Sequence, residues 1–382
     1  MGEHRQRVIG LWRGLEAGPT LVCAAAVHGN EPSGVLALQR VMTGLEKRQP
    51  RLRGEFIGVA GNLGAMVLDQ RYVTDDLNRH WLPGNIERVR RAPLEELAHE
   101  DLEMRELLET LHDAFARARG EVYFLDLHTS SADGDAFVCI GDTLRNRAFA
   151  EAFCVPVILG LEEQIDGSLL EYVNNLGHVT VGVEAGQHGA AASVDHHEAI
   201  IWLALANAGM LQESDVPRLD EHRERLRQAS HHLHGFMEVR HRHPIGEQDG
   251  FRMEEGFSNF QHIEAGQLLA CDRDGEIRAS ESGRILLPLY QGQGSDGFFI
   301  AREVHTFWLR LSSLLRWFGF DRVLHWLPGV HRHPDREATL VIHTDLARWF
   351  ALEIFHLLGY RKRRFEGGVL VVTRRRFDHR GR

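Results

Sequence analysis

The sequence predicts an α/β protein in which a mixed, mostly parallel sheet carries helices on both faces and is followed by a smaller C-terminal β domain. Two patterns lead to this prediction. From Val8 to Leu211, apolar strand-like runs alternate with amphipathic helical stretches, which is typical of sheets covered by helices on both sides. From about His231 to Val304 the pattern changes to short strands and glycine-rich turns, as in small sandwiches or barrels.

The elements follow in chain order. In the first part we expect strands at 8–12, 20–27, 55–60, 121–128, 135–140, 155–159 and 178–184, and helices at 34–48, 93–118, 143–153, 167–176 and 193–211. A charged segment, 212–227, then interrupts the alternation.

The second part holds expected strands at 236–240, 267–271, 283–289 and 297–302. Beyond it we expect helices at 305–318 and 345–358 and strands at 338–342 and 368–373. The predicted division is therefore an α/β domain at 1–227, a small β domain at 228–304, and an α/β appendage of unknown role at 305–382.

The composition limits the partners. The chain has 382 residues, of which 43% are hydrophobic and 26% are charged, and this is an ordinary globular composition. It contains no run of 18 apolar residues, so we expect no membrane-spanning helix. The N-terminus lacks the apolar core of a signal peptide, so we expect a cytoplasmic protein. Although the net charge is −10, residues 361–382 are basic, and a solvated terminus is favoured there over a nucleic-acid-binding tail. We expect no nucleic-acid or membrane partner, and the composition is compatible with a homo-oligomer.

Two strands end on histidine. The run Leu21–Val27 is followed by His28, with Glu31 three residues later at a strand-to-helix corner, and a second apolar run ends at His128. Imidazole nitrogen and carboxylate oxygen are zinc ligands, and a catalytic zinc takes three protein ligands. The three residues therefore suggest a metal site, with Asp126, two positions before His128 on the same strand face, as support for its ring. The alternative is that they are ordinary core and surface residues.

A loop between these strands, RYVTDDLNR, contains Arg71, Asn78 and Arg79. Arginine forms bidentate pairs with carboxylates and asparagine adds a neutral donor, so the loop suits an anionic substrate. Equally, its arginines could pair with Asp75 and Asp76 at the surface.

Glu184 closes the strand VGVE before a glycine turn. Beside a metal-bound water, such a carboxylate serves as general base. The competing interpretation is a carboxylate near the N-terminus of the helix around Ser193.

Taken together, HGNEPSG, RYVTDDLNR, DLHTS and VGVEAG resemble the succinylglutamate desuccinylase/aspartoacylase family, relatives of zinc carboxypeptidases. The stretch GRILLPLYQGQGSDGFF resembles the family's C-terminal β domain, so that the resemblance covers about 7–304. It implies one zinc ion per chain and assigns the site as follows: His28, Glu31 and His128 as ligands, Glu184 as acid/base, Arg71 polarising the scissile carbonyl, and Asn78, Arg79 and Tyr290 binding substrate. One departure is that Leu169–Val183 contains no arginine or lysine, where aspartoacylase has a further substrate arginine.

The resemblance implies a zinc-dependent hydrolase that cleaves the amide bond of a small N-acyl amino acid. Ester hydrolysis is chemically open as well, because both reactions pass through similar tetrahedral intermediates. A carboxypeptidase-like peptidase and a non-catalytic binding protein on the same fold are the alternatives.

Overall fold

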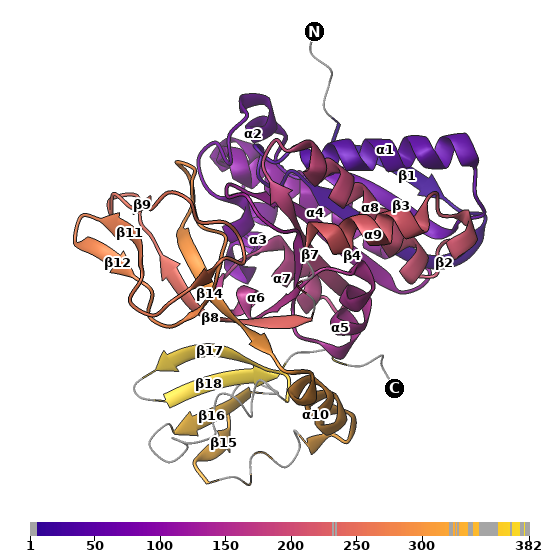
Figure 1. The fold of residues 1–382 in the computed structure, drawn as a ribbon. Coiled ribbons are helices and arrows are strands. Elements are labelled where there is room, and N and C mark those ends of the chain that lie inside the picture. The colour runs from indigo at the N-terminus through magenta and orange to yellow at the C-terminus, as the bar shows by residue number, and fades with distance from the viewer. Residues whose placement is uncertain are drawn as a thin grey trace.

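A computed structural model describes residues 6–230, 233, 235–320, 324, 326, 328–334, 339–343, 358–366, 369–374 and 378. Nearly all of the helix predicted at 345–358 lies outside these residues. The described part is a large mixed sheet with helices on both faces and two smaller sheets toward the C-terminus (Figure 1), which confirms the predicted fold class.

Across the described residues, eleven strands form the main sheet in the order β1-β3-β2-β4-β7-β5-β6-β8-β14-β13-β10. Its first part consists of β1 (Val8–Arg13), β2 (Glu16–Ala25), β3 (Arg53–Ala60), β4 (Val122–Ser130), β5 (Phe137–Ile140), β6 (Val157–Leu159) and β7 (Val179–Gln187). The strands β3, β2, β4 and β7 run parallel, while β1 and β5 pair antiparallel with their neighbours β3 and β7. The carboxyl ends of the parallel strands therefore meet at one edge, where ligands bind in open α/β sheets.

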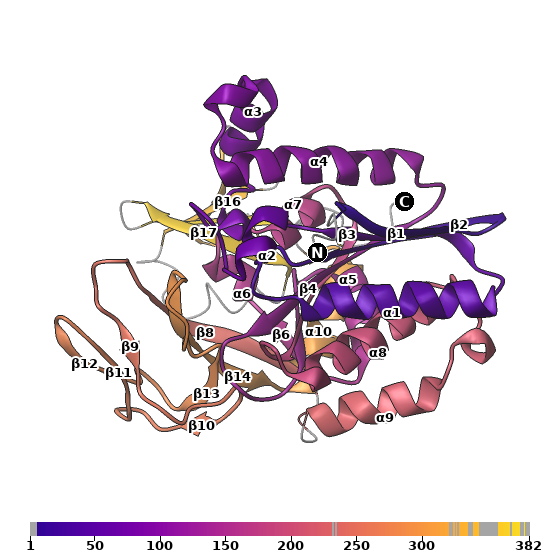
Figure 2. The same cartoon turned by 90° about the horizontal axis from the view of Figure 1, so that it is seen from above.

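The helices lie on the two faces of this sheet (Figure 2). One face carries α1 (Ser33–Arg48), α8 (Ala191–Asn207) and α9 (Leu219–Ala229), and the other carries α3 (Pro83–Arg91), α4 (His99–Arg117) and α7 (Leu169–Asn175). Shorter helices are α2 (Leu63–Leu68), α5 (Leu144–Ala150) and α6 (Leu161–Gln164). Strand alternation divides the core between the faces: Leu21 and Cys23 of β2 pack with the α1 and α8 side, and Val22 packs with the α4 side.

Two predicted boundaries were wrong. The charged segment 212–227 is not a break, because most of it belongs to α9. Leu226 of this helix is buried in the core, and Leu219 packs against the same cluster, so the helix is amphipathic despite its charge. The helix predicted from residue 93 begins at His99, after a short 3₁₀ turn at Leu94–Glu96.

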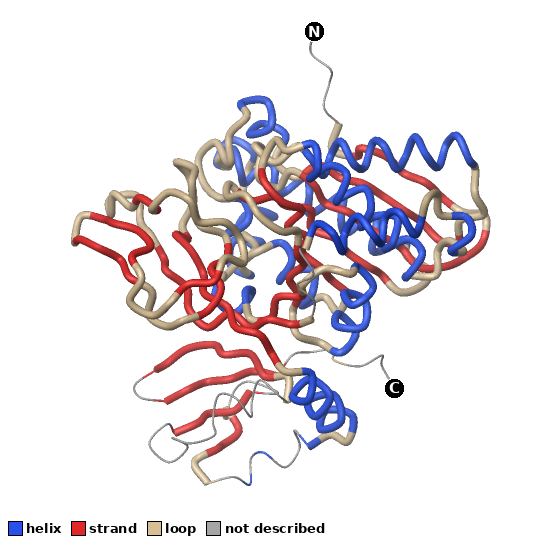
Figure 3. The backbone as a smooth tube through the Cα atoms, in the orientation of Figure 1, coloured by secondary structure: helices blue, strands red, loops and turns tan. Residues whose placement is uncertain are grey.

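The main sheet runs across the predicted boundary at residue 228. Strand β8 (Phe236–Pro244) pairs parallel with β6 and antiparallel with β14 (Asp296–Val304). The sheet then continues through β13 (Gly283–Leu286) to β10 (His262–Ile263), and a separate small sheet contains β9 (Arg252–Met253), β11 (Leu268–Asp272) and β12 (Gly275–Arg278). Figure 3 shows strands dominating this part of the chain, with long loops between them.

The appendage contains α10 (Thr306–Trp317) and the four strands β15 (Val330–Arg332), β16 (Thr339–His343), β17 (Tyr360–Glu366) and β18 (Val369–Arg374). Helix α10 is held to the rest of the chain by Arg316, which is fully buried. Its guanidinium donates to the Asp142 carboxylate at 2.7 Å and lies 3.3 Å from the Asp378 carboxylate. Within the described residues, no helix has the length and apolar character needed to cross a membrane.

Candidate active site

The turn after β2 presents His28 and Glu31. Ala26, which is fully buried, has φ of 52°, and this left-handed residue ends the strand and redirects the chain. At Gly29 a side chain could not be accommodated, because a Cβ there would lie 2.1 Å from the backbone of Ala65. Pro32 then caps α1. The sequence of this turn thus fixes both side chains at the carboxyl edge of the sheet, where they are buried.

His128 and Glu184 are brought together by strand register. In the parallel pair β4 and β7, His128 is opposite Glu184 and Asp126 is opposite Gly182. Residues two apart on a strand share a face, so these four positions form one patch. A side chain at Gly182 would not fit, because a Cβ there would lie 2.6 Å from the Cys139 sulfur.

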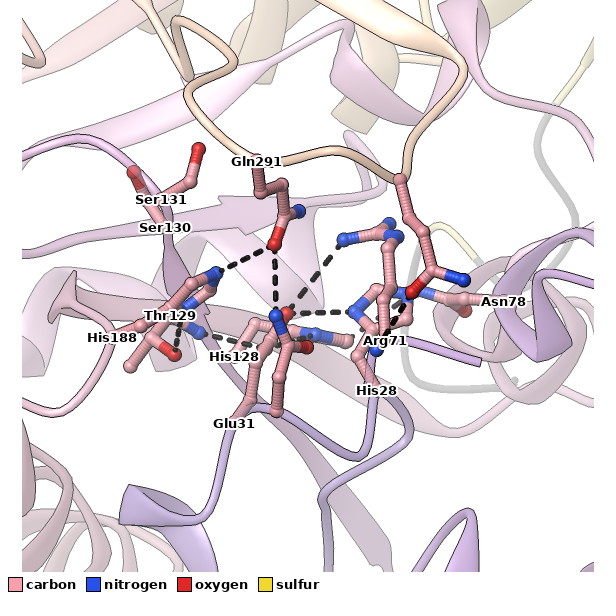
Figure 4. A network of polar contacts seen from close by, with 12 residues as sticks. His28, Glu31, Arg71, Asn78, His128, Thr129, Ser130, Ser131, His188 and Gln291 are labelled. Carbon is pink, nitrogen blue, oxygen red and sulfur yellow. Dashed lines mark hydrogen bonds and ion pairs between the residues drawn. The ribbon is translucent and has the colours of Figure 1, made fainter. Parts of the chain in front are cut away.

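His28, Glu31 and His128 converge on one point (Figure 4). Glu31 Oε1 lies 2.8 Å from His28 Nδ1, and Glu31 Oε2 lies 3.0 Å from His128 Nδ1. One ligand atom from each residue lies within 4.8 Å of the others. Two imidazole nitrogens and one carboxylate oxygen form a zinc-type donor set that leaves a fourth position for water or substrate. The residues present therefore fit the implied metal.

Each of the two histidines has a carboxylate behind it. His28 Nε2 lies 3.1 Å from Asp76 Oδ1, and His128 Nε2 lies 3.1 Å from Asp126 Oδ1. A carboxylate on the far nitrogen fixes the tautomer and orientation of a metal-binding imidazole. With Nε2 engaged in this way, Nδ1 of each ring is directed to the shared point. Sequence reasoning considered Asp126 for this role, whereas it treated Asp76 only as a partner for arginine.

Opposite charges perturb the titration of these groups. Burial alone would raise the pKa of Glu31, but the two adjacent histidines hold that pKa well below its usual range. The pKa of His128 is raised well above its ordinary value, because Asp126 and Glu31 outweigh the effect of burial. For Asp76, Arg71 and His28 likewise outweigh burial and lower the pKa strongly. Glu31 and Asp76 are therefore ionised in the metal-free protein.

Glu184 differs from these groups. Burial raises its pKa to about 8, and among the described residues its Oε2 atom is buried without a hydrogen-bond partner. It also lines the same cavity as His28, Glu31 and His128. A carboxyl group with a raised pKa and an unused oxygen in such a cavity is suited to exchanging a proton.

The arginine loop contributes three residues to the cavity wall, but its arginines are already paired. Arg71 donates from Nε and Nη2 to Asp76 Oδ2 at 3.1 and 3.0 Å, and its Nη1 lies 3.8 Å from Glu31 Oε1. Arg79 Nη2 donates to Asp296 at 2.6 Å. Asn78 Oδ1 accepts from the backbone NH of Leu169 at 2.8 Å. Both interpretations of this loop therefore have support in the structure. The loop lines the cavity, as a substrate-binding loop would, and Arg71 pairs with Asp76.

The loop between β13 and β14, residues 287–295, lies over the site. Gln291 Oε1 accepts from Asn30 Nδ2 at 2.8 Å and lies 3.3 Å from His188 Nε2, and Figure 4 shows Gln291 above the three candidate ligands. Gln293 Oε1 accepts from the Arg71 backbone NH at 3.1 Å. Sequence reasoning missed these two glutamines, because contacts between residues more than 200 positions apart leave no local signal.

The structure places Tyr290 differently from the prediction. Its hydroxyl donates to the Glu254 carbonyl at 2.8 Å and accepts from the Phe257 backbone NH at 2.9 Å. The side chain is 39% exposed and is not among the residues that line the cavity. Its neighbour Gln291 occupies the position that faces the site.

A family model described as the succinylglutamate desuccinylase/aspartoacylase catalytic domain matches residues 17–201. Over these residues, which are just under half of the chain, the sequence belongs to this family. The matched range contains the three candidate metal ligands, Glu184 and the arginine loop, so the resemblance inferred from the four motifs is confirmed.

Two curated members of the succinylglutamate desuccinylase/aspartoacylase family illustrate the sequence similarity. The succinylglutamate desuccinylase of Pseudomonas putida KT2440 is 31% identical over 88 residues, which is 22% of this chain and 26% of that protein. The enzyme of the same name from Photorhabdus laumondii is 33% identical over 90 residues, 22% of this chain and 28% of that protein. The aligned segments therefore span about a quarter of the length of each relative.

Solved structures extend the likeness of fold. A succinylglutamate desuccinylase/aspartoacylase from Rhodobacter sphaeroides superposes with a TM-score of 0.57 at 17% identity, covering 77% of this chain and 88% of that one. The product-bound ectoine utilization protein EutE (DoeB) from Ruegeria pomeroyi gives a TM-score of 0.55 at 20% identity, covering 77% and 87%. The fold of this desuccinylase/aspartoacylase family member is thus shared well beyond the catalytic segment.

Proposed function

We propose that the protein is a zinc-dependent hydrolase that cleaves the amide bond of a small N-acyl amino acid, giving a carboxylate and a free amine. The observation that carries this proposal is the position of Glu184, opposite His128 across two parallel strands and with a buried oxygen that has no partner among the described residues. Family membership supports the same reaction class, since the relatives compared above are named desuccinylases.

The metal would be held by His28, Glu31 and His128. When bound, zinc polarises a carbonyl oxygen and lowers the pKa of water to roughly 7. Asp76 and Asp126 keep the two imidazoles in position, as described above. The Thr129 backbone NH donates to Glu31 Oε2 at 2.9 Å and fixes the third donor.

The chain's own groups account for the proton transfers. The Glu184 carboxylate accepts a proton from the attacking water as the carbon–oxygen bond forms. It then delivers that proton to the amide nitrogen as the carbon–nitrogen bond breaks, so that the amine leaves neutral. Arg71 Nη1 is the guanidinium nitrogen not bonded to Asp76, and it lies near Glu31. From there it donates to the oxygen that becomes negative in the tetrahedral intermediate.

A small substrate is favoured over a polypeptide. The cavity beside the candidate ligands measures about 130 Å³, and the loop 287–295 is fastened above it by Gln291 and Gln293. Ser131 fastens the same loop through the Tyr290 backbone NH, at 3.0 Å. A partly covered cleft of this size suits a small acyl amino acid, with one of its groups in the cavity, better than an extended chain, which disfavours the peptidase alternative.

The test is a hydrolysis screen of the zinc-loaded protein against N-acyl amino acids, matched esters and short peptides, comparing wild type with Glu184→Gln. The glutamine keeps the shape but cannot take the proton, so we expect turnover to fall by roughly 10²–10⁴-fold while the zinc content is unchanged. Glu198→Gln, a change on α8 outside the cavity lining, is the matched control. Hydrolysis of peptides alone, or equal rates in wild type and Glu184→Gln, would overturn the proposal.

A further inference from the structure

We propose that the substrate group facing Arg79 is uncharged and apolar, and that Asp296 sets this preference. The inference rests on the proposed function and names the substrate class within it. Asp296 begins β14, far from the catalytic motifs in sequence, and lines the same cavity as Glu184 and Arg79. Its carboxylate, which belongs to the protein itself, pairs with Arg79 in the place that a substrate carboxylate would otherwise take.

Arg79 is the residue expected from sequence to grip a substrate carboxylate, but both of its Nη atoms already have partners, while its Nε is buried without a hydrogen-bond partner among the described residues. Nη2 donates to Asp296 Oδ2 at 2.6 Å and Nη1 donates to the Asn78 carbonyl at 3.0 Å. An arriving carboxylate would have to displace Asp296, leaving that carboxylate partly buried and short of one partner. Because an unpaired buried charge is costly, Arg79 discriminates against a second anion.

Asp296 is itself held in place. Arg242 of β8 donates from Nε to Asp296 Oδ1, and its Nη1 donates to the Gln164 carbonyl at the end of α6. The side chains of Arg79 and Asp296 are 21% and 11% exposed. Arg79, Asp296 and Arg242 therefore form an ion network in which each oxygen of Asp296 is held by a different arginine.

The neighbouring wall of the cavity is apolar. Cys139 and Leu170 lie beside Gly182, two residues before Glu184. Leu161 and Phe299 belong to a buried cluster against which Cys139 and Ile165 also pack, and all of them line the cavity. The segment 169–183, which contributes Leu170 and Gly182 to this wall, contains no arginine or lysine. An aliphatic group buried here gains the hydrophobic free energy that a carboxylate would lose.

The balance of charge points the same way. Among the described residues that line the cavity, five carboxyl groups (Glu31, Asp126, Glu162, Glu184 and Asp296) are set against the two guanidinium groups of Arg71 and Arg79. Even with a divalent cation bound, this lining does not attract a dianion. The cavity volume of about 130 Å³ is close to that of an engineered cavity, about 150 Å³, that accepts benzene. A branched aliphatic side chain or acyl chain is of suitable size.

The experiment uses pairs of substrates that differ in charge but hardly in shape. N-acetylleucine and N-acetylaspartate vary the amino-acid side, and N-isovalerylglycine and N-malonylglycine vary the acyl side. With the zinc-loaded full-length protein, we expect kcat/KM to favour the apolar member of at least one pair by about tenfold or more. The carboxylate member should lead in neither pair.

Asp296→Asn releases Arg79 from its internal partner. We expect this variant to shift the apolar-to-carboxylate ratio of kcat/KM by about tenfold or more toward the carboxylate substrate. The control Asp274→Asn, an exposed aspartate of the same β region, should leave the ratio unchanged. If Asp296→Asn fails to fold, the wild-type ratios still decide the matter.

Two outcomes overturn the inference in distinguishable ways. Hydrolysis with a preference for the carboxylate member of either pair, or an Asp296→Asn ratio equal to that of wild type, refutes the apolar preference and leaves the proposed function standing. No hydrolysis of any member by the zinc-loaded protein refutes the proposed function, and the inference with it.

Discussion

Asp76 offers a test of the whole arrangement, because it supports a candidate metal ligand, His28, and Arg71, the arginine proposed to polarise the carbonyl, at once. Replacing it with alanine removes the 3.1 Å contact with His28 Nε2 and both bonds from Arg71. Losing a carboxylate behind a ligating histidine typically costs 10–100-fold in metal affinity, or about 1.4–2.7 kcal/mol. In addition, the largely buried Arg71 loses its main partner, a kind of change that destabilises proteins by about 3–5 kcal/mol.

The assay is a competition titration of zinc against a chromophoric chelator, combined with chemical unfolding. We expect Asp76→Ala to weaken zinc binding by about 10–100-fold and to lower the free energy of unfolding. Asp76→Asn should have a smaller effect on zinc, because its amide oxygen can still accept from His28. Asp75→Ala is the matched control, since Asp75 is adjacent, chemically identical and exposed. Wild-type zinc affinity in Asp76→Ala would refute the reasoning.

Three further predictions concern the ligands, the base and the appendage. His128→Ala should retain little of the expected zinc, about one equivalent per chain, by elemental analysis; full zinc would exclude His128 as a ligand. Because burial raises the pKa of Glu184 to about 8 in the metal-free protein, the folded state holds this proton more tightly than the unfolded state does. The stability of metal-free wild type should therefore fall, relative to Glu184→Gln, as pH rises from about 4.5 to 8, and parallel thermal unfolding curves would contradict this. Arg316→Ala should lower the free energy of unfolding by about 1.5–3 kcal/mol, because it removes one of the two arginine partners of the buried Asp142, which keeps Arg147, whereas the exposed Arg310→Ala should not; equal stabilities in denaturant would refute this role.

Local sequence was sufficient to predict the positions of those site residues that a single strand or turn determines. The apolar run Leu21–Val27 and its glycine turn place His28 and Glu31 at the sheet edge. His128 follows a second apolar run and could be placed at the same edge for the same reason. The register between β4 and β7 then places Glu184 beside it.

Other features depend on contacts that no short segment contains. Asp296, Gln291 and Gln293 reach the site across more than 200 positions, so their roles depend on how β8 and β14 extend the main sheet. Helix α9 was missed for a different reason. Its charged residues face solvent, and its few apolar contacts, such as Leu226, become visible only once α8 is in place.

The parallel pairing of β6 with β8 has a consequence for biosynthesis. Until residues 236–244 have been made and have docked, β6 is an unpaired sheet edge with free backbone donors and acceptors. Exposed edges of this kind invite pairing with other chains. The emerging protein therefore passes through a period in which all three candidate metal ligands have been made while one flank of its sheet is open to aggregation. Docking of β8 closes that flank, and the loop 287–295, which is made later, then covers the cavity.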